Sequence, residues 1–108
     1  MVNAKIKKAK KSVCPVTYTV NIMGGKWKPH ILYFLLSGAK RFNELQRLAG
    51  NPSARILTAQ LRELEADKII KREVYDQIPP KVEYSLTSKG KSLNNVLHVM
   101  AKWGIENG

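Results

Sequence analysis

The chain has 108 residues, of which 44% are hydrophobic, and this suits one globular domain and excludes a disordered chain. Nineteen lysines and arginines against eight acidic residues give a net charge of +11, which indicates a polyanionic partner. The single cysteine argues against a disulfide scaffold and suits a reducing, cytoplasmic setting, and no apolar run is long enough to span a membrane.

Residues 1–13 are predicted to form a flexible basic arm, and residues 14–108 one domain. The first twelve positions hold five lysines and no acid, with little apolar content to insert into a membrane surface. The basic excess continues from Lys26 to Arg62, whereas acidic residues dominate from Glu63 to Ser85. This distribution is typical of a one-sided binding face.

Two helices are predicted after the arm. Pro15 opens a short helix over about Val16–Ile22, which Gly24 and Gly25 end. Pro29 suits the first turn of the second helix, because its missing N–H costs nothing there. Gly38 is expected to end this second helix, which is predicted to be nearly buried. The apolar residues of the second helix are Ile31, Leu32, Phe34, Leu35 and Leu36.

A short helix, a tight turn and a longer helix follow, which is the helix-turn-helix arrangement. The short helix is predicted over Arg41–Leu48. The break Ala49–Pro52 contains a glycine and a proline, so no helix can cross it. Ser53 is predicted to cap the longer helix, which runs to about Asp67. The apolar face of the short helix consists of Phe42, Leu45 and Leu48.

A β-hairpin and a long helix complete the prediction. β-Branched alternation predicts strands over Ile69–Val74 and Val82–Leu86, joined by the polar, proline-stiffened loop 76–81. The fold class is therefore mainly α with a small β-hairpin, and the hairpin is the wing of a winged helix-turn-helix domain. Thr87 is expected to cap the final helix. The apolar stripe of this helix consists of Leu93, Leu97, Met100 and either Trp103 or Ile105.

The helix after Ser53 is predicted to read DNA bases. At about 100° per residue, Leu57, Leu61 and Leu64 share one stripe, and the arginines lie on the opposite side. Arginine can bond guanine O6 and N7, and threonine can contact a base edge or the thymine methyl. A solvated charged face is the alternative, but the preceding turn and the following wing favour DNA. The predicted base-reading residues are Arg55, Thr58, Ala59 and Arg62.

Other residues are expected to meet DNA phosphates, because they lie at helix starts, at turns or on the wing. The role of Arg72 stays open, since on the first wing strand it could instead pair with Glu83 across the hairpin. The predicted backbone contacts are Lys26, Lys28, Lys40, Arg41, Ser53 and Lys81.

From about Cys14 to Trp103 the chain resembles the HxlR-type family of winged-helix transcription regulators. The motifs that carry the resemblance are Cys14-Pro15, Gly24-Gly25-Lys26-Trp27, Arg41-Phe42-Asn43-Glu44-Leu45, the pattern from Ser53 to Glu65, and Pro80-x-Val82-Glu83-Tyr84-Ser85-Leu86-Thr87. The resemblance implies a homodimer built from the first and last helices, which binds a pseudo-palindromic operator in double-stranded DNA and more often represses than activates. It thereby assigns Leu93, Leu97, Met100 and Trp103 to the dimer interface.

Two turns depart from the family pattern. Asn51-Pro52 stands where glycine and isoleucine are usual, so the resemblance does not fix the start of the recognition helix. Asp67-Lys68-Ile69 replaces an acidic-glycine-aliphatic step, so the turn into the wing must form without glycine.

Cys14 is a candidate sensor of electrophiles or oxidants, because some members of the family respond through a cysteine near the N-terminus. It precedes a helix start and follows a lysine cluster, and both features lower a thiol pKa. The alternative is an inert side chain at the dimer contact. With no second cysteine, oxidation would need an intersubunit Cys14–Cys14 bond or a small-thiol adduct.

No enzymatic activity, metal site or cofactor is expected. His30 and His98 are too scattered to form a zinc site with Cys14, and no phosphate loop or nucleophile elbow is present. Two other functions stay open: an RNA-binding winged helix, and a protein-interaction module whose basic charge is incidental. A small-molecule effector is compatible with the sequence, which does not identify it.

Overall fold

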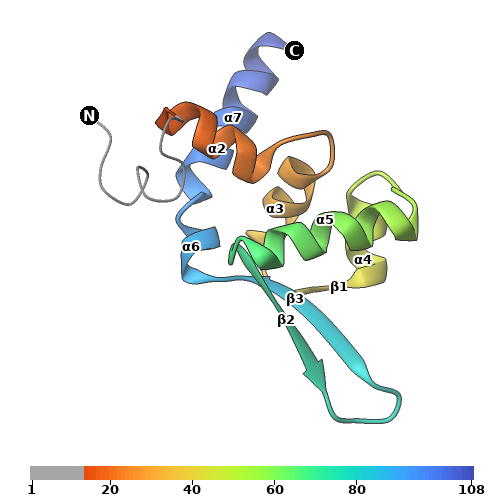
Figure 1. Cartoon of the computed structure of the whole chain (residues 1–108). Coiled ribbons are helices and arrows are strands. Elements are labelled where there is room, and N and C mark those ends of the chain that lie inside the picture. The colour runs from red at the N-terminus through yellow and green to blue at the C-terminus, as the bar shows by residue number, and fades with distance from the viewer. Residues whose placement is uncertain (1–13) are drawn as a thin grey trace.

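The computed structural model describes residues 14–108, and the predicted arm over 1–13 lies outside the described residues. Helices gather around one end of a small antiparallel sheet, and its two longer strands project beyond them as a hairpin (Figure 1). This is the predicted mainly helical architecture with a projecting β-hairpin. Among the described residues, no helix is both long and apolar enough to cross a membrane.

The first two helices form close to their predicted positions, although the second ends at Leu35, three residues before the predicted stop at Gly38. Helix α2 spans Pro15–Met23 and helix α3 spans Lys28–Leu35. Cys14 caps α2, because its Sγ accepts a hydrogen bond from the Thr17 N–H at 3.4 Å. Pro29 lies in the first turn of α3. Helix α3 is buried on one face rather than nearly all round: Ile31, Leu32 and Leu35 are buried, and Phe34 and Leu36 are half-buried.

The helix-turn-helix pair consists of α4, Phe42–Leu48, and α5, Ala54–Ala66. Ser53 caps α5 as predicted, since its Oγ accepts a hydrogen bond from the Ile56 N–H at 3.1 Å. In the turn between α4 and α5, where the family usually has glycine, Asn51 adopts a φ of 60°. Asparagine adopts this left-handed conformation more readily than most other side chains.

The predicted apolar face of α4 is wrong at one position. Leu45 is fully buried and Phe42 packs against the core, but Leu48 is 39% exposed. Ala49, just beyond the helix, is buried in its place. Ala49 follows Leu45 by four residues, so it lies on the same side of the helix, and its N–H still donates to the Leu45 carbonyl at 2.8 Å, whereas Leu48 points about 100° away from Ala49.

The sheet has three antiparallel strands in the order β1-β3-β2. Strands β2, Ile70–Tyr75, and β3, Lys81–Leu86, form the predicted hairpin, with bounds within one residue of those expected. Strand β1, Lys40–Arg41, pairs with β3 and was not predicted. Two residues are too few to show the alternation by which a strand is recognised.

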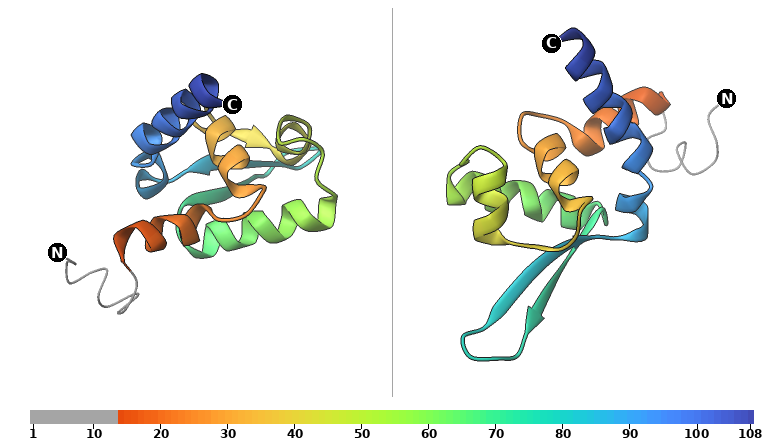
Figure 2. Two further views of the ribbon diagram at one scale, coloured as in Figure 1. Left: turned by 90° about the horizontal axis from the view of Figure 1, so that it is seen from above. Right: turned by 180° about the vertical axis from the view of Figure 1, so that it is seen from behind.

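The hairpin has two different faces. Lys71 lies opposite Ser85, and Arg72 lies opposite Tyr84. Because successive side chains of a strand point to opposite faces, these two pairs lie on opposite sides of the sheet. Tyr84 is buried in the core, so its face is the one that packs on the helices. The far end of the hairpin stands clear of the helices in the right-hand view of Figure 2.

The turn from α5 into β2 forms without glycine, as expected. Lys68 has a φ of 61°, and its N–H donates to the Glu65 carbonyl at 2.9 Å. The Ile69 N–H donates to the Leu64 carbonyl at 2.9 Å. This left-handed helix end usually holds glycine, and a side chain there costs about 1 kcal/mol.

The predicted single C-terminal helix is wrong, because the structure divides it into α6, Ser88–Lys91, and α7, Asn94–Asn107. Thr87 caps α6 rather than a long helix, and its Oγ1 accepts a hydrogen bond from the Gly90 N–H at 3.1 Å. Gly90 packs so closely on the sheet that a Cβ there would lie 2.1 Å from the Ile69 carbonyl oxygen. This contact fixes α6 against the start of β2, and the chain turns before α7.

One hydrophobic core joins these elements. Leu97 is the buried residue of α7, and it attaches that helix to the rest. The core consists of Ile22, Met23, Ile31, Leu32, Leu35, Leu45, Ala49, Leu57, Leu61, Leu64, Ile69, Ile70, Tyr84, Leu86 and Leu97.

Candidate DNA-binding face

Helix α5 presents the predicted outward face to solvent. Leu57, Leu61 and Leu64 are buried, with exposed fractions of 0%, 2% and 0%. Burial of this stripe turns the opposite side of the helix outward. The predicted division of α5 into a core face and an outward face is therefore confirmed. On the outward face, Arg55, Ala59 and Arg62 are exposed and Thr58 is half-buried.

The N-terminus of α5 adds a feature suited to a phosphate. Ser53 is exposed, and its hydroxyl hydrogen remains available while its Oγ accepts from the Ile56 N–H. The first N–H groups of a helix carry a partial positive charge. The first turn of α5 holds no acidic residue that would cancel this charge. An anion at this end of the helix is therefore stabilised.

A hollow of about 360 Å³ lies between α5 and the hairpin. Arg62 of α5 and Arg72 of β2 both line it, together with Thr58, Tyr84 and Glu65. Within residues 14–108 neither arginine forms an ion pair. The sequence left the role of Arg72 open, and the lining of this hollow places Arg72 beside Arg62 of α5.

Glu83 is not the partner of Arg72. The register places Glu83 opposite Glu73, one step along the strand from the Arg72 pair. The carboxylate of Glu83 instead binds the Lys81 ammonium at 3.2 Å. The interpretation of Arg72 as one half of a cross-hairpin ion pair is therefore wrong.

Lys28, predicted as a phosphate contact, is turned inward. Its side chain is 9% exposed, and its Nζ binds Glu63 Oε1 at 2.5 Å. An ammonium group is stable in such surroundings only when it is paired, so the contact holds α3 against α5. The predicted role of Lys28 is therefore corrected from DNA contact to helix packing.

Two other predicted phosphate contacts have local partners. The Lys40 Nζ donates to Ser37 Oγ at 2.9 Å and to the Gly38 carbonyl at 3.2 Å. Lys81 is half-buried, binds Glu83 and lies 4.9 Å from the centre of the Tyr75 ring. The Glu83 carboxylate offsets the positive charge of Lys81, so this lysine offers a phosphate less attraction than its position on the wing suggests.

Lys26 and Arg41 are more accessible. Both side chains are exposed, and the Lys26 Nζ lies 4.7 Å from the centre of the Trp27 ring. Arg41 precedes α4, where its backbone N–H donates to Glu44 Oε1 at 2.9 Å. The Arg41 guanidinium forms no ion pair with the residues that the structure describes.

Cys14 is exposed at the start of α2. Its Sγ lies 3.3 Å from Thr17 Oγ1 and accepts from the Thr17 N–H at 3.4 Å. The hydrogen bond with the Thr17 hydroxyl, aided by that N–H, lowers the pKa of the Cys14 thiol below its ordinary value. The lysine cluster that precedes Cys14 lies outside the described residues. No three histidine, cysteine or acidic side chains between 14 and 108 lie close enough together to hold a metal ion.

The four residues assigned to the dimer interface differ in exposure. Leu97 is 3% exposed and belongs to the core of its own chain, and Leu93 is half-buried. Met100 and Trp103 are 45% and 67% exposed. Met100 and Trp103 therefore present the apolar surface of α7, while Leu97 anchors the helix.

These features define a DNA-binding transcription regulator of the winged helix-turn-helix class: an exposed arginine-bearing helix after a tight turn, beside a projecting hairpin. The chain belongs to the HxlR-like helix-turn-helix family, whose model matches residues 22–108. The predicted family is therefore confirmed.

Relatives and solved structures agree with this assignment. The HTH-type transcriptional regulator YybR of Bacillus subtilis is 52% identical over 97 residues, which cover 90% of this chain and 78% of YybR. The redox regulator HypR in its reduced form is 51% identical, with a TM-score of 0.83 over 87% of this chain and 93% of HypR. The reduced form of YodB from B. subtilis is 33% identical, with a TM-score of 0.74 over 88% and 94% of the two chains.

Proposed function

We propose that the protein acts in the cytoplasm as a homodimer that places two α5 helices in major grooves of a pseudo-palindromic operator. The observation that carries this proposal is the outward face of α5, where exposed Arg55 and Arg62 flank the small Ala59. Assignment as a repressor rests on the family resemblance.

Base reading and phosphate binding are divided between two sets of residues. Arg55 and Arg62 donate to guanine, Thr58 contacts a base edge or a thymine methyl, and Ala59 allows the backbone to approach. Arg72 joins the phosphate set because it lines the same hollow as Arg62. The proposed phosphate contacts are Ser53, Lys26, Lys40, Arg41, Arg72 and Lys81.

Exposed apolar surface supports the homodimer. Val16 and Val20 of α2 are 72% and 56% exposed, and Ile105 of α7 is 82% exposed. A groove of about 370 Å³ between α3 and α7 is lined by Tyr33, Met100 and other largely apolar residues. Exposed apolar surface of this kind is typical of a protein interface.

Selection of bound duplexes from a random pool tests the proposal. We expect an inverted repeat with half-sites one or two helical turns apart, about 10 or 20 base pairs. Affinity for the selected duplex is expected to fall steeply with salt, because binding releases counterions from DNA. Selected duplexes without a repeat, or tighter binding to structured RNA, would contradict the proposal.

Cys14 is proposed to regulate DNA binding by responding to oxidants or electrophiles. Its exposure and its hydrogen bonds with Thr17 favour the reactive thiolate. Two similar solved structures show HypR in its reduced and oxidised forms, and this likeness supports the proposal of a redox response for the present chain.

The Thr17→Val variant is expected to raise the pKa of the Cys14 thiol, because it removes the hydroxyl and keeps the backbone N–H. The pH at which iodoacetamide alkylation reaches half its maximal rate should rise, so the variant reacts more slowly near neutral pH. Thr19→Val is the control, because the Thr19 hydroxyl donates to the Pro15 carbonyl at 3.0 Å instead. Equal pH profiles of alkylation for the two variants would contradict the predicted effect of the Thr17 hydroxyl on the Cys14 thiol. If diamide still released DNA from the Cys14→Ser variant, Cys14 would not be the sensor.

A further inference from the structure

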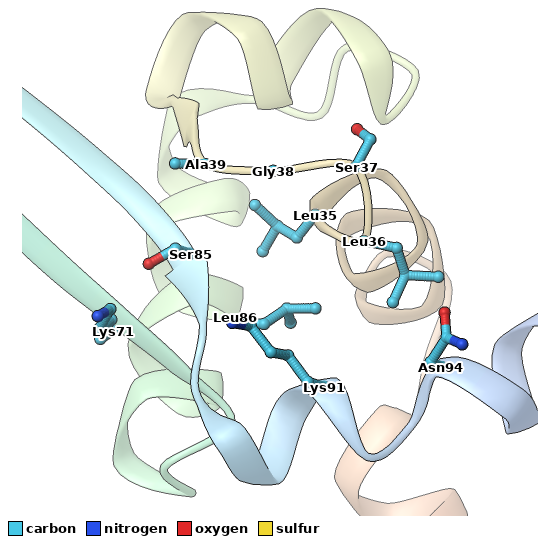
Figure 3. A pocket seen from close by; sticks show the side chains of 10 residues that line it. All are labelled: Leu35, Leu36, Ser37, Gly38, Ala39, Lys71, Ser85, Leu86, Lys91 and Asn94. Atoms are coloured by element: carbon cyan, nitrogen blue, oxygen red, sulfur yellow. The ribbon is translucent and has the colours of Figure 1, made fainter.

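A cavity of about 560 Å³ lies where α3, the hairpin, α6 and α7 meet (Figure 3). Lys71 and Ser85, which are opposite one another in the register, line this cavity. Arg72 and Tyr84 line the hollow beside α5 on the other side of the sheet. The Lys71–Ser85 wall of the cavity therefore lies on the sheet face opposite Arg72 and Tyr84, and no residue lines both the cavity and the hollow beside α5.

The polar side of the cavity is basic. Lys71 comes from β2 and Lys91 from α6, and neither forms an ion pair with any residue from 14 to 108. Figure 3 shows the Lys91 side chain extending across Leu86 towards the strands that carry Lys71 and Ser85. Two ammonium groups and a hydroxyl on one wall are donors for one anionic group.

The rest of the lining is largely apolar, with Ser37 and Asn94 as further polar residues. Leu35 and Leu36 come from the end of α3, and the buried Leu86 from the end of β3. The amide of Asn94 lies at the opposite rim from Lys71 in Figure 3. A volume of this size, with an apolar wall and a few polar groups that fix orientation, is typical of a small-molecule site.

We propose that this cavity binds a small organic anion, a carboxylate carried on an apolar body. The carboxylate bonds Lys71, Lys91 and Ser85, and the apolar body packs on the leucines. The occupant contacts both the wing and the short helix that leads into α7. It can therefore shift the wing relative to α7 without occupying the DNA-binding face.

The test uses 2-naphthoate as the probe, followed by amide chemical shifts of the full-length protein in the absence of DNA. We expect saturable shifts at Gly38, Ser85 and Leu86. Lys71→Gln and Lys91→Gln should each weaken binding about tenfold, because each removes a charged donor.

Two controls isolate the charge. Lys102→Gln makes the same substitution on the exposed face of α7, away from the cavity lining, and should leave the affinity within about twofold. The neutral 2-naphthamide should bind about tenfold more weakly than 2-naphthoate. A dispersed amide spectrum for each lysine variant shows that it is folded.

Three results would overturn the proposal: equal binding of 2-naphthoate and 2-naphthamide, inorganic phosphate binding as tightly as 2-naphthoate, or shifts confined to Tyr33 and Met100 in the α3–α7 groove. Because the measurement contains no DNA, its failure would leave the proposed operator binding standing. Failure of operator binding would likewise leave this site intact.

Discussion

Replacement of Gly90 by alanine is expected to lower the free energy of unfolding by about 3 kcal/mol or more, at the upper end of the cost of overpacking. The added Cβ would lie 2.1 Å from the Ile69 carbonyl oxygen and 3.0 Å from a Leu86 methyl carbon. The Ile69 carbonyl cannot easily turn away, because it accepts hydrogen bonds from the Thr87 N–H and hydroxyl, both at 3.0 Å. Urea denaturation followed by circular dichroism measures the loss.

Gly104→Ala is the matched control for this variant. Gly104 lies inside α7, and a Cβ there would meet nothing within 4 Å. Alanine favours a helix over glycine, so this change should not destabilise the protein. If Gly90→Ala proved as stable as Gly104→Ala, the close packing of α6 on the sheet would be refuted.

Arg55→Ala and Arg62→Ala are each expected to weaken binding to the selected operator by about 1–3 kcal/mol, or roughly 5- to 150-fold. Each change removes a guanidinium that donates to guanine, so the loss should be much smaller on a random duplex. Fluorescence anisotropy at one fixed salt concentration, with both duplexes in parallel, measures this difference.

Lys81→Ala provides the comparison for a phosphate contact. Phosphates are the same in every sequence, so this variant should lose affinity for both duplexes by a similar factor. Its effect should be modest, because Glu83 already offsets the Lys81 charge. If both arginine variants lost affinity equally on the two duplexes, the assignment of base reading to α5 would fail.

The sequence could predict the parts of the fold that depend on neighbouring residues. Ser53 could be recognised as a cap because its partner, the Ile56 N–H, is three residues away. The outward face of α5 followed from the spacing of the three buried leucines. The sequence also showed that the turn before the wing must form without glycine, and in the structure the backbone of Lys68 adopts the left-handed conformation there.

Contacts between distant segments could not be predicted in this way. Lys28 carries the charge of a DNA contact, and only Glu63, thirty-five positions away, turns it inward. Gly90 looks like an ordinary helix residue until the Ile69 carbonyl is placed beside it. The cavity of Lys71 and Lys91 draws its walls from several separate elements, so no single motif could reveal it.

Helix α7 continues well past its last buried side chain, Leu97, to Asn107. A helical segment of fewer than about 12 residues is marginal in water without support. The end of α7 should therefore fray in dilute solution and become ordered when another surface covers it. Helical content at this terminus would then rise with protein concentration, so the amide exchange of residues 98–107 would report how much of the protein is assembled.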